Sequence, residues 1–349
     1  MRKEKFLKLF SNEPKFRWNQ IQQSFFDPSI SGWDDISTIP QKMRKKIKQE
    51  IPWISVADET VIVNKNKDTI KTALKLTDNY QIETVLMENS KQEFTVCLSS
   101  QVGCAMNCLF CATGKMGFIR NLDEDEIIDQ VRYWQGYIVK NQPEKRISNL
   151  VIMGMGEPMA NYQNVKNAIK IILKYTDVGP TKITVSTVGI WPTLYDLLED
   201  KEWPNVRLAI SLHAAQPEIR KKIVPSTAPD FFISLTDWAK KYLAIFGNKK
   251  HHLSFEYIMI NDLNDTETAA AALVKLAKKI GKVKINLIPY NQTPDSIYKH
   301  SRPDKIEKFA DYLSHHGIDV TSRKSMGDDI AAACGQLITT DNDKCIVKK

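Results

Sequence analysis

Three of the six cysteines in this 349-residue chain stand close together, and cysteine is a residue type well suited to chemistry. Cys104, Cys108 and Cys111 form a C-x3-C-x2-C pattern. Iron–sulfur cubanes are usually held by four cysteine thiolates. Three thiolates leave one iron open, where a substrate or cofactor can coordinate, as at an open zinc position. The spacing therefore favours an iron–sulfur centre with one open iron.

A zinc site is the alternative interpretation of the same cysteines. It would need a fourth ligand, for which Cys97 and His213 are candidates. Zinc sites usually combine two paired C-x2-C halves, and this sequence contains no second half. From spacing alone, a zinc-stabilised RNA-binding protein without catalytic activity stays open as a second function.

The composition is that of a soluble globular protein, with 42% hydrophobic and 26% charged residues. The N-terminus is charged, and no apolar run approaches the ~18 residues of a membrane-spanning helix. We therefore expect a cytoplasmic monomer without membrane contact, whose reduced cysteines serve metal binding or catalysis. The formal net charge of +8 permits a nucleic-acid partner without establishing one.

From residue 93 onward the sequence alternates between strand and helix patterns. Such alternation predicts an α/β domain with a parallel sheet covered by helices. Six strands, with a seventh at 318–322, are too few for a closed eight-stranded barrel of ~250 residues. We predict a partial (β/α)6 TIM-like barrel that binds ligands at the carboxyl ends of its strands. The other six strands are expected at 94–99, 147–153, 183–187, 206–212, 253–259 and 283–288.

The chain divides into three predicted parts. Residues 1–92 are expected to form a small N-terminal accessory domain, 93–325 the barrel, and 326–349 a C-terminal segment. The accessory domain should contain short helices and a small β element. Its segment 42–48 carries five basic residues in seven, which indicates either a solvated helix face or an RNA-facing patch.

Several motifs resemble one known family. A C-x3-C-x2-C loop after the first strand of a β/α domain is the signature of radical S-adenosylmethionine (SAM) enzymes. The resemblance implies a [4Fe–4S] cluster held by Cys104, Cys108 and Cys111, whose open iron binds SAM. Four further motifs resemble the RlmN/Cfr family of radical SAM RNA methyltransferases: Ser99–Cys104, Cys111–Gly114, Met153–Pro158 and Gly327–Leu337.

The resemblance also implies which residues contact SAM. Gly156 and Glu157 follow a predicted buried strand, where glycine allows close approach and a carboxylate can pair with an ammonium. Without the family, this segment could equally be a plain strand-to-helix turn. His213 alone would more often be a hydrogen-bonded core histidine. The remaining implied contacts also lie at the carboxyl ends of predicted strands: Ser186, Ser211, Leu212, His213 and Asn291.

Three residues outside the cluster have implied catalytic roles. Cys334 takes a methyl group from a first SAM, and the 5′-deoxyadenosyl radical from a second SAM removes a hydrogen from that methyl. The resulting radical adds to C2 of an adenine. Cys97 releases the product through a transient disulfide with Cys334, and Glu83 accepts the C2 proton. From the residues alone, both thiols would be buried hydrophobes and Glu83 an exposed strand carboxylate.

The implied substrates are adenosines in 23S rRNA and in tRNA. The target base must be unpaired, because a stacked base cannot reach the radical. A Cfr-type enzyme that methylates C8 is the alternative, but Pro158 follows Glu157 here, where Cfr has alanine. Flavodoxin or ferredoxin is the electron donor implied by the family. Cys345 lies in a polar tail and receives no role.

Overall fold

The computed structural model describes residues 1–14, 16–247, 253–293 and 296–337. Within them, one ten-stranded and one two-stranded sheet carry the fold. The strands are β1 (Val56–Val63), β2 (Thr69–Leu76), β3 (Gln81–Glu88), β4 (Phe94–Cys97), β5 (Gln101–Gly103), β6 (Phe118–Asn121), β7 (Ile147–Ile152), β8 (Ile183–Thr187), β9 (Arg207–Ser211), β10 (Leu253–Met259), β11 (Val283–Pro289) and β12 (Asp319–Ser322). The α-helices are α1 (Arg2–Leu9), α2 (Phe16–Ser24), α3 (Gln41–Glu50), α4 (Ala112–Met116), α5 (Glu124–Asn141), α6 (Tyr162–Tyr175), α7 (Trp191–Glu199), α8 (Pro217–Ile223), α9 (Phe231–Phe246), α10 (Glu267–Ile280) and α11 (Pro303–His315).

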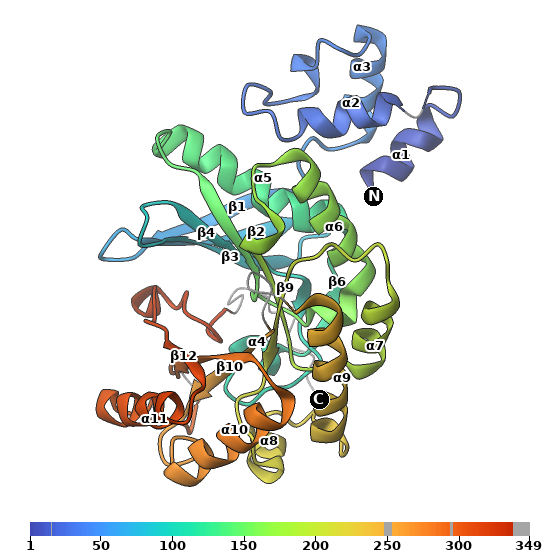
Figure 1. Ribbon diagram of the computed structural model, residues 1–349. Coiled ribbons are helices and arrows are strands. Elements are labelled where there is room, and N and C mark those ends of the chain that lie inside the picture. Colours follow the sequence, from blue (N-terminus) through green and yellow to red (C-terminus); the bar gives the residue numbers. More distant parts are fainter. Residues whose placement is uncertain (15, 248–252, 294–295, 338–349) are drawn as a thin grey trace.

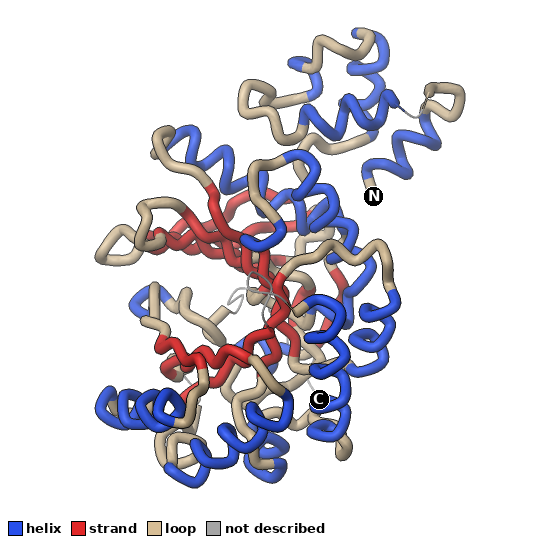
Figure 2. Tube along the Cα trace, in the orientation of Figure 1, coloured by secondary structure: helices blue, strands red, loops and turns tan. Residues whose placement is uncertain are grey.

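Seven strands of the large sheet form a parallel barrel that stays open. They pair in the order β4, β7, β8, β9, β10, β11, β12, and every one of these pairs is parallel. Figure 1 shows this sheet curved like a letter C, with α5, α6, α7, α9 and α10 along its convex side. Figure 2 shows the strands inside and the helices outside. The predicted partial barrel is confirmed, and β12 is its seventh strand.

The two faces of the barrel strands differ in polarity. Convex-face residues pack with the helices into the main hydrophobic core, among them Leu150, Val185, Leu208, Phe255 and Ile285. Their neighbours along each strand point to the other face, because side chains alternate across a strand. The barrel interior therefore includes a polar cavity instead of a fully packed core. The cavity has a volume of about 320 Å³ and is lined by Thr184, Arg207, Ser254, Lys284, Asn286 and Arg323.

Strands β1, β2 and β3 extend the same sheet beyond β4. They form an antiparallel meander, and β3 pairs antiparallel with β4, where Val85 lies opposite Cys97. The expected boundary between residues 92 and 93 falls between β3 and β4. Because these two strands are hydrogen-bonded neighbours, the sheet is continuous across that boundary.

The helices before β1 enclose a small hydrophobic core of their own. Buried ion pairs join this helical unit to α5. Asp129 of α5 accepts hydrogen bonds from Arg2 at 2.9 Å and from Arg132 at 2.6 Å. All three side chains are buried, so the pairing compensates for the loss of water around each charge. The core of the helical unit includes Phe6, Trp18, Ile21, Phe25, Trp33 and Ile47.

The basic segment 42–48 lies on α3. Met43 and Ile47 point into the small core, whereas Lys42, Lys45 and Lys46 are exposed. The segment therefore presents an exposed basic helix face, which fits a solvated surface and an RNA-facing patch alike.

Three short helices, α4, α7 and α8, were not predicted from the sequence. Helices α7 and α8 have nine and seven residues, too few for a clear 3.6-residue periodicity, and each begins with proline in its first turn. The longer helices agree with the predicted alternation of strands and helices. For example, α5 starts directly after Asp123, whose side chain accepts a hydrogen bond from the backbone of Glu126. Among the described helices, none combines the length and the apolar composition needed to span a membrane.

Candidate active site

The three clustered cysteines lie in the loop between β5 and α4. Cys104 follows β5, a short strand that separates this loop from β4, and Cys111 is the N-cap residue of α4. Gly114 lies so close to the loop that an added Cβ would be 2.8 Å from the backbone nitrogen of Cys108. Since no larger residue fits there, the loop packs tightly against the first turn of α4.

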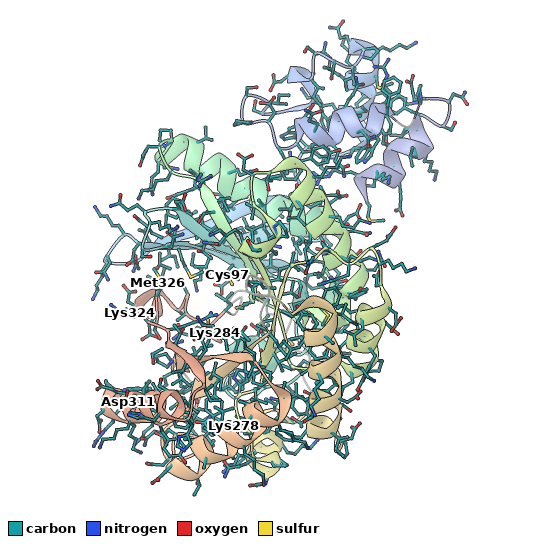
Figure 3. The ribbon with its side chains drawn as sticks, in the orientation of Figure 1. Cys97, Lys278, Lys284, Asp311, Lys324 and Met326 are labelled. Atoms are coloured by element: carbon teal, nitrogen blue, oxygen red, sulfur yellow. The ribbon has the colours of Figure 1, made fainter. Side chains whose placement is uncertain are left out.

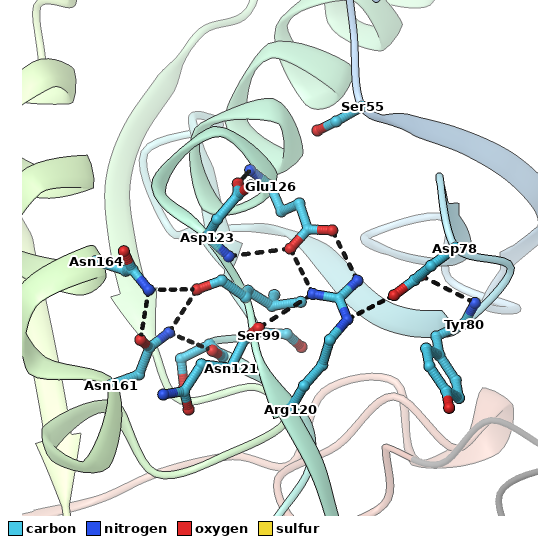
Figure 4. A network of polar contacts seen from close by, with 12 residues as sticks. Ser55, Asp78, Tyr80, Ser99, Arg120, Asn121, Asp123, Glu126, Asn161 and Asn164 are labelled. Atoms are coloured by element: carbon cyan, nitrogen blue, oxygen red, sulfur yellow. Dashed lines mark hydrogen bonds and ion pairs between the residues drawn. The ribbon is translucent and has the colours of Figure 1, made fainter. Parts of the chain in front are cut away.

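A polar network holds β6 and the start of α6 near this loop (Figure 4). Arg120 of β6 donates two hydrogen bonds to Glu126, both at 2.8 Å, and one to Asp78 at 2.6 Å. Asn161 donates to the carbonyl of Leu122 at 2.7 Å. Because β6 pairs with β5, these contacts also fix the strand that leads into the cysteine loop.

The three thiols lie near enough to influence one another's charge. Burial raises the pKa of Cys104 to about 12 and raises the pKa values of Cys108 and Cys111. A metal centre removes this penalty, because it binds thiolates and displaces their protons. Phe110 and Tyr290 belong to the apolar cluster around the loop.

Three soft thiol donors in an apolar setting fit an iron–sulfur centre better than a hard cation. Across the parts of the chain that the structure describes, no three His, Cys, Asp or Glu side chains already stand in positions that could hold a metal ion. The cysteines are thus neighbours without being in ligating positions.

Glu157 is a buried carboxylate after the carboxyl end of β7. Its two oxygens accept hydrogen bonds from the backbone nitrogens of Met159 and Val188, both at 2.9 Å. Burial raises the pKa of Glu157, and no ion pair involving it occurs among the described residues. A cationic ligand group would offset that penalty, which fits the SAM ammonium. Gly156 has φ +101° and packs against Gln101, where an added Cβ would be 2.5 Å from Cβ of Gln101.

The next candidate SAM contacts lie at the carboxyl ends of β8 and β9. The hydroxyl oxygens of Ser186 and Ser211 are 3.0 Å apart. Leu212 and His213 both donate backbone hydrogen bonds to the carbonyl of Glu256, at 3.0 and 3.1 Å. The structure therefore brings these four residues together at one edge of the sheet, as predicted from the strand ends.

His213 is a buried, neutral histidine. Its Nδ1 accepts a hydrogen bond from the backbone nitrogen of Ile258 at 3.2 Å. Burial lowers the pKa of His213 to about 3, and the nearby charge of Arg220 acts in the same direction. Its ring meets Phe110 of the cysteine loop edge-on, with ring centres 4.6 Å apart. His213 thus connects the end of β9 with the cysteine loop.

Asn291, which follows β11, contacts the segment that carries Cys334. Its side-chain amide donates to the carbonyl of Cys334 at 3.2 Å and accepts from the hydroxyl of Ser325 at 2.6 Å. The same segment also packs on α4, because the backbone nitrogen of Ala112 donates to the carbonyl of Gly335 at 2.7 Å. Cys334 therefore lies in a segment bound both to the end of β11 and to the helix after the cysteine loop.

Cys97 and Cys334 are free thiols whose charges influence each other. Cys97 is buried, whereas Cys334 is exposed, unlike the buried small hydrophobe expected from its sequence context. Burial raises the pKa of Cys97 to about 12, and the charge of Arg323 opposes this shift. Figure 3 shows Cys97 facing the concave side of the sheet, the side on which Met326 also lies.

Glu83 is buried, so the expectation of an exposed strand carboxylate is wrong. An oxygen of its carboxylate is 2.8 Å from Nζ of Lys71. Its backbone carbonyl accepts a hydrogen bond from Ser99 at 2.6 Å. The reason for its burial is that the C-terminal segment lies over this part of the sheet, where Lys71 also donates to the carbonyl of Ala331 at 3.1 Å.

Comparison with known proteins places the chain in a family. Residues 98–273 match the model of the radical SAM superfamily. The dual-specificity RNA methyltransferase RlmN of Nautilia profundicola is 37% identical over 94% of both chains. RlmN of Wigglesworthia glossinidia brevipalpis is 42% identical over 93% of this chain and 84% of its own length. The crystal structure of a radical SAM methyltransferase from Sphaerobacter thermophilus covers 95% of both chains with a TM-score of 0.86 and 33% identity.

The chain belongs to the RlmN family of radical SAM methyltransferases. Radical SAM enzymes use a [4Fe–4S] cluster and SAM, so family membership decides between the two metal hypotheses in favour of iron–sulfur. The individual SAM contacts and catalytic roles stay predictions. Cys345 lies outside the described residues.

In this RlmN family member, a buried arginine that was not predicted from the sequence joins the ends of β8 and β9, where candidate SAM contacts lie. Arg220 belongs to a basic run on α8 that resembles a solvated face, yet it is fully buried. Its guanidinium donates to the carbonyls of Val188 at 2.7 Å and Ser211 at 2.8 Å, and also to that of Leu212. The sequence feature that could have revealed the burial of Arg220 is its spacing from Ile223, since residues three apart share a helix face.

Proposed function

We propose that this protein methylates C2 of adenosine in 23S rRNA and in tRNA. The observation that carries the proposal is the placement of Glu83 and Cys97 on neighbouring strands beside the exposed thiol of Cys334. This arrangement combines a methyl carrier, a second thiol and a carboxylate base in one site. Relatives that cover nearly the whole chain are called dual-specificity RNA methyltransferases.

Cys104, Cys108 and Cys111 would hold the cluster, and Glu157 with the strand-end serines would hold SAM. When bound, the cluster and SAM would together supply a transferable methyl group and a 5′-deoxyadenosyl radical. His213 stays neutral at physiological pH, since its pKa is about 3, and so adds no positive charge near the cysteine loop. The apolar cluster that includes Phe110 and Tyr290 surrounds Cys108 and shields it from water.

Cys334 acts first, as a nucleophile that becomes S-methylated. The surrounding protein desolvates this thiolate and raises the pKa of Cys334, and the charge of Arg323 opposes that shift. Loss of a hydrogen atom from the S-methyl group then gives a carbon radical attached to Cys334, which adds to C2 of the adenine. An electron-poor carbon such as C2 lacks the nucleophilicity for ordinary methyl transfer, so a radical carried by the protein supplies the missing reactivity.

Cys97 and Glu83 then release the product. The radical adduct first passes one electron to a one-electron acceptor, such as the oxidised form of a flavodoxin- or ferredoxin-type protein, and Glu83 then takes the proton from C2. Cys97 attacks the sulfur of Cys334, the sulfur–carbon bond breaks, and the methylene carbon takes up a proton to become the methyl group. The reaction leaves a Cys97–Cys334 disulfide, which an external dithiol reduces before the next cycle.

The other components follow from the chemistry and the family. A one-electron donor of the flavodoxin or ferredoxin class would reduce the cluster. We expect the chain to work as a monomer in the cytoplasm, with unpaired adenosines as its targets.

Mass spectrometry of nucleosides tests the proposal directly. RNA would be incubated anaerobically with the reconstituted enzyme, SAM and a reductant, and then digested. We expect 2-methyladenosine in both 23S rRNA and tRNA. Detection of 8-methyladenosine instead would favour the Cfr-type alternative, and unmodified adenosine would contradict both.

A further inference from the structure

Lys71 is a buried lysine in β2 that contacts two parts of the candidate site at once. Its Nζ is 2.8 Å from a carboxylate oxygen of Glu83, and the side chains of both residues are less than a tenth exposed. The same Nζ donates a hydrogen bond of 3.1 Å to the carbonyl of Ala331. An ammonium group has three N–H donors, so it can bind both oxygens at the same time.

The sheet register places Lys71 on the same face as the second thiol. Lys71 lies opposite Val85 of β3, and Val85 lies opposite Cys97 of β4. Directly paired residues of neighbouring strands point to one face, and so do residues two apart on a strand. Glu83 is two residues from Val85, so Lys71, Glu83 and Cys97 share a face. Diagonal pairs such as Glu83 and Cys97 are typically ~7–8 Å apart.

The C-terminal segment lies directly on β2 at this point. Ala331 has φ +52°, a left-handed conformation that residues other than glycine rarely adopt. Gly327 packs so closely that an added Cβ would be 2.6 Å from the Cγ2 of Thr69. Asp329 accepts a hydrogen bond of 3.0 Å from the backbone nitrogen of Lys65. The hydrogen bond from Lys71 thus stabilises a strained residue only three positions before Cys334.

We propose that Lys71 is a positioning residue that fixes the Glu83 carboxylate relative to the segment carrying Cys334. The inference rests on the proposed roles of these two residues. A covalent adduct on Cys334 presents its C2–H bond to a base only if both groups keep a fixed relative position. One ammonium bound to both provides that constraint. Methylation of Cys334 does not use Glu83, so it depends on Lys71 much less than proton removal does.

The test separates these two stages in single-turnover reactions. We expect Lys71→Met to become methylated on Cys334 within a few-fold of the wild-type rate, measured by protein mass spectrometry. Release of 2-methyladenosine should fall by roughly 100-fold, in the range typical of general-base effects, while a covalent RNA–protein adduct accumulates on denaturing gels. Lys71→Arg should restore release in part, because a guanidinium can also bridge two oxygens.

Two further variants serve as controls. One tests whether losing any lysine charge from β2 affects release, and the other tests whether the Lys71 variant fails only because it is unstable. Lys75 lies on the same strand, where it pairs with Glu59 at 3.3 Å and is well exposed. Lys75→Met should therefore behave like wild type. The double variant Lys71→Met/Glu83→Gln leaves no unpaired buried charge, so it should fold even if Lys71→Met does not. If Lys71 acts through Glu83, adduct release in the double variant should equal that in Glu83→Gln alone.

The outcomes distinguish this inference from the proposed function. A wild-type chain that forms no 2-methyladenosine overturns the proposed function, and a Glu83→Gln variant that releases adduct normally overturns the role of Glu83. If both behave as expected, two results overturn the inference for Lys71. One is normal release by Lys71→Met. The other is release in the double variant that is clearly slower than in Glu83→Gln.

Discussion

The candidate site has two halves that are built in different ways. In the SAM half, at the ends of β7, β8 and β9, Glu157, His213 and Arg220 are buried and bonded to backbone atoms. In the thiol half, Cys334 is exposed on a segment with little regular structure. That segment is held by individual hydrogen bonds, such as those from the side chains of Lys71 and Asn291 and from the backbone nitrogen of Ala112.

The two halves differ in construction and also in their proposed roles: one binds SAM, and the other carries out the methyl transfer. A buried charge bonded to several backbone groups cannot shift without leaving those groups unsatisfied, so the SAM half is preorganised. In the proposed mechanism, the thiol of Cys334 meets a methyl donor, an adenine and Cys97 in turn. A segment held by individual hydrogen bonds suits a residue with several successive partners. Variants of the two halves should therefore fail in different ways.

Cys334→Ala should have the largest effect, because it removes the methyl carrier. We expect no detectable 2-methyladenosine. The SAM half is untouched, so SAM affinity measured by equilibrium dialysis and iron content should stay at wild-type levels. Residual methylation of RNA by this variant would show that the methyl group travels without Cys334.

Cys97→Ala should stop the reaction one step later. Without the second thiol, the adduct on Cys334 has no sulfur nucleophile to release it. We expect a covalent RNA–protein species that persists on denaturing gels, with product limited to less than one per enzyme. Multiple turnovers by this variant would rule out the resolving role of Cys97.

Arg220→Met should damage the SAM half without touching either thiol. It deprives buried carbonyls at the ends of β8 and β9 of their donor, so we expect a loss of about 3 kcal/mol in unfolding free energy. The affinity for SAM should fall at least tenfold. Lys222→Met is the matched control, since Lys222 is exposed on the same helix. Unchanged SAM binding by Arg220→Met would mean that the segments at the ends of β8 and β9 keep their shape without the Arg220 guanidinium.

His213 should have the smallest effect on stability at neutral pH, and its replacement should show mainly as a change in pH dependence. Its pKa is about 3 in the fold, below the usual 6.5, so protonation favours the unfolded chain. Its contribution to stability is present above pH 6.5 and is lost as the pH falls towards 3, at about 1.4 kcal/mol per pH unit. His213→Asn keeps a residue that tolerates the observed φ of +60°. In urea unfolding at pH 7, 5 and 4, the variant should show a shallower loss of stability; an equal slope would contradict a buried neutral histidine.

The strands of the barrel were predictable because each carries a short apolar or β-branched run. The candidate SAM contacts came from the resemblance to the family, and the predicted strand ends agreed with their positions. The burial of Glu83 was not predictable, because the segment that covers it is far away in sequence: Lys71 and Ala331 are 260 positions apart. Alternation within a strand tells which residues share a face, but it does not tell what covers that face.

Arg220 shows a second limit. A basic residue beside two lysines on a short helix has the composition of a solvated surface. Its role depends on three carbonyls from the ends of two other strands. Such convergence is a property of the folded chain, because it requires β8, β9 and α8 to meet at one point.

The polar cavity inside the barrel has a consequence for what this space can hold. A volume of about 320 Å³ has room for on the order of ten water molecules. Most barrel interiors are filled by side chains, which would have to be displaced. Here polar side chains line the space, so water inside it can form hydrogen bonds with its walls. A polar group that entered this cavity would exchange with solvent and would need no repacking of the barrel walls.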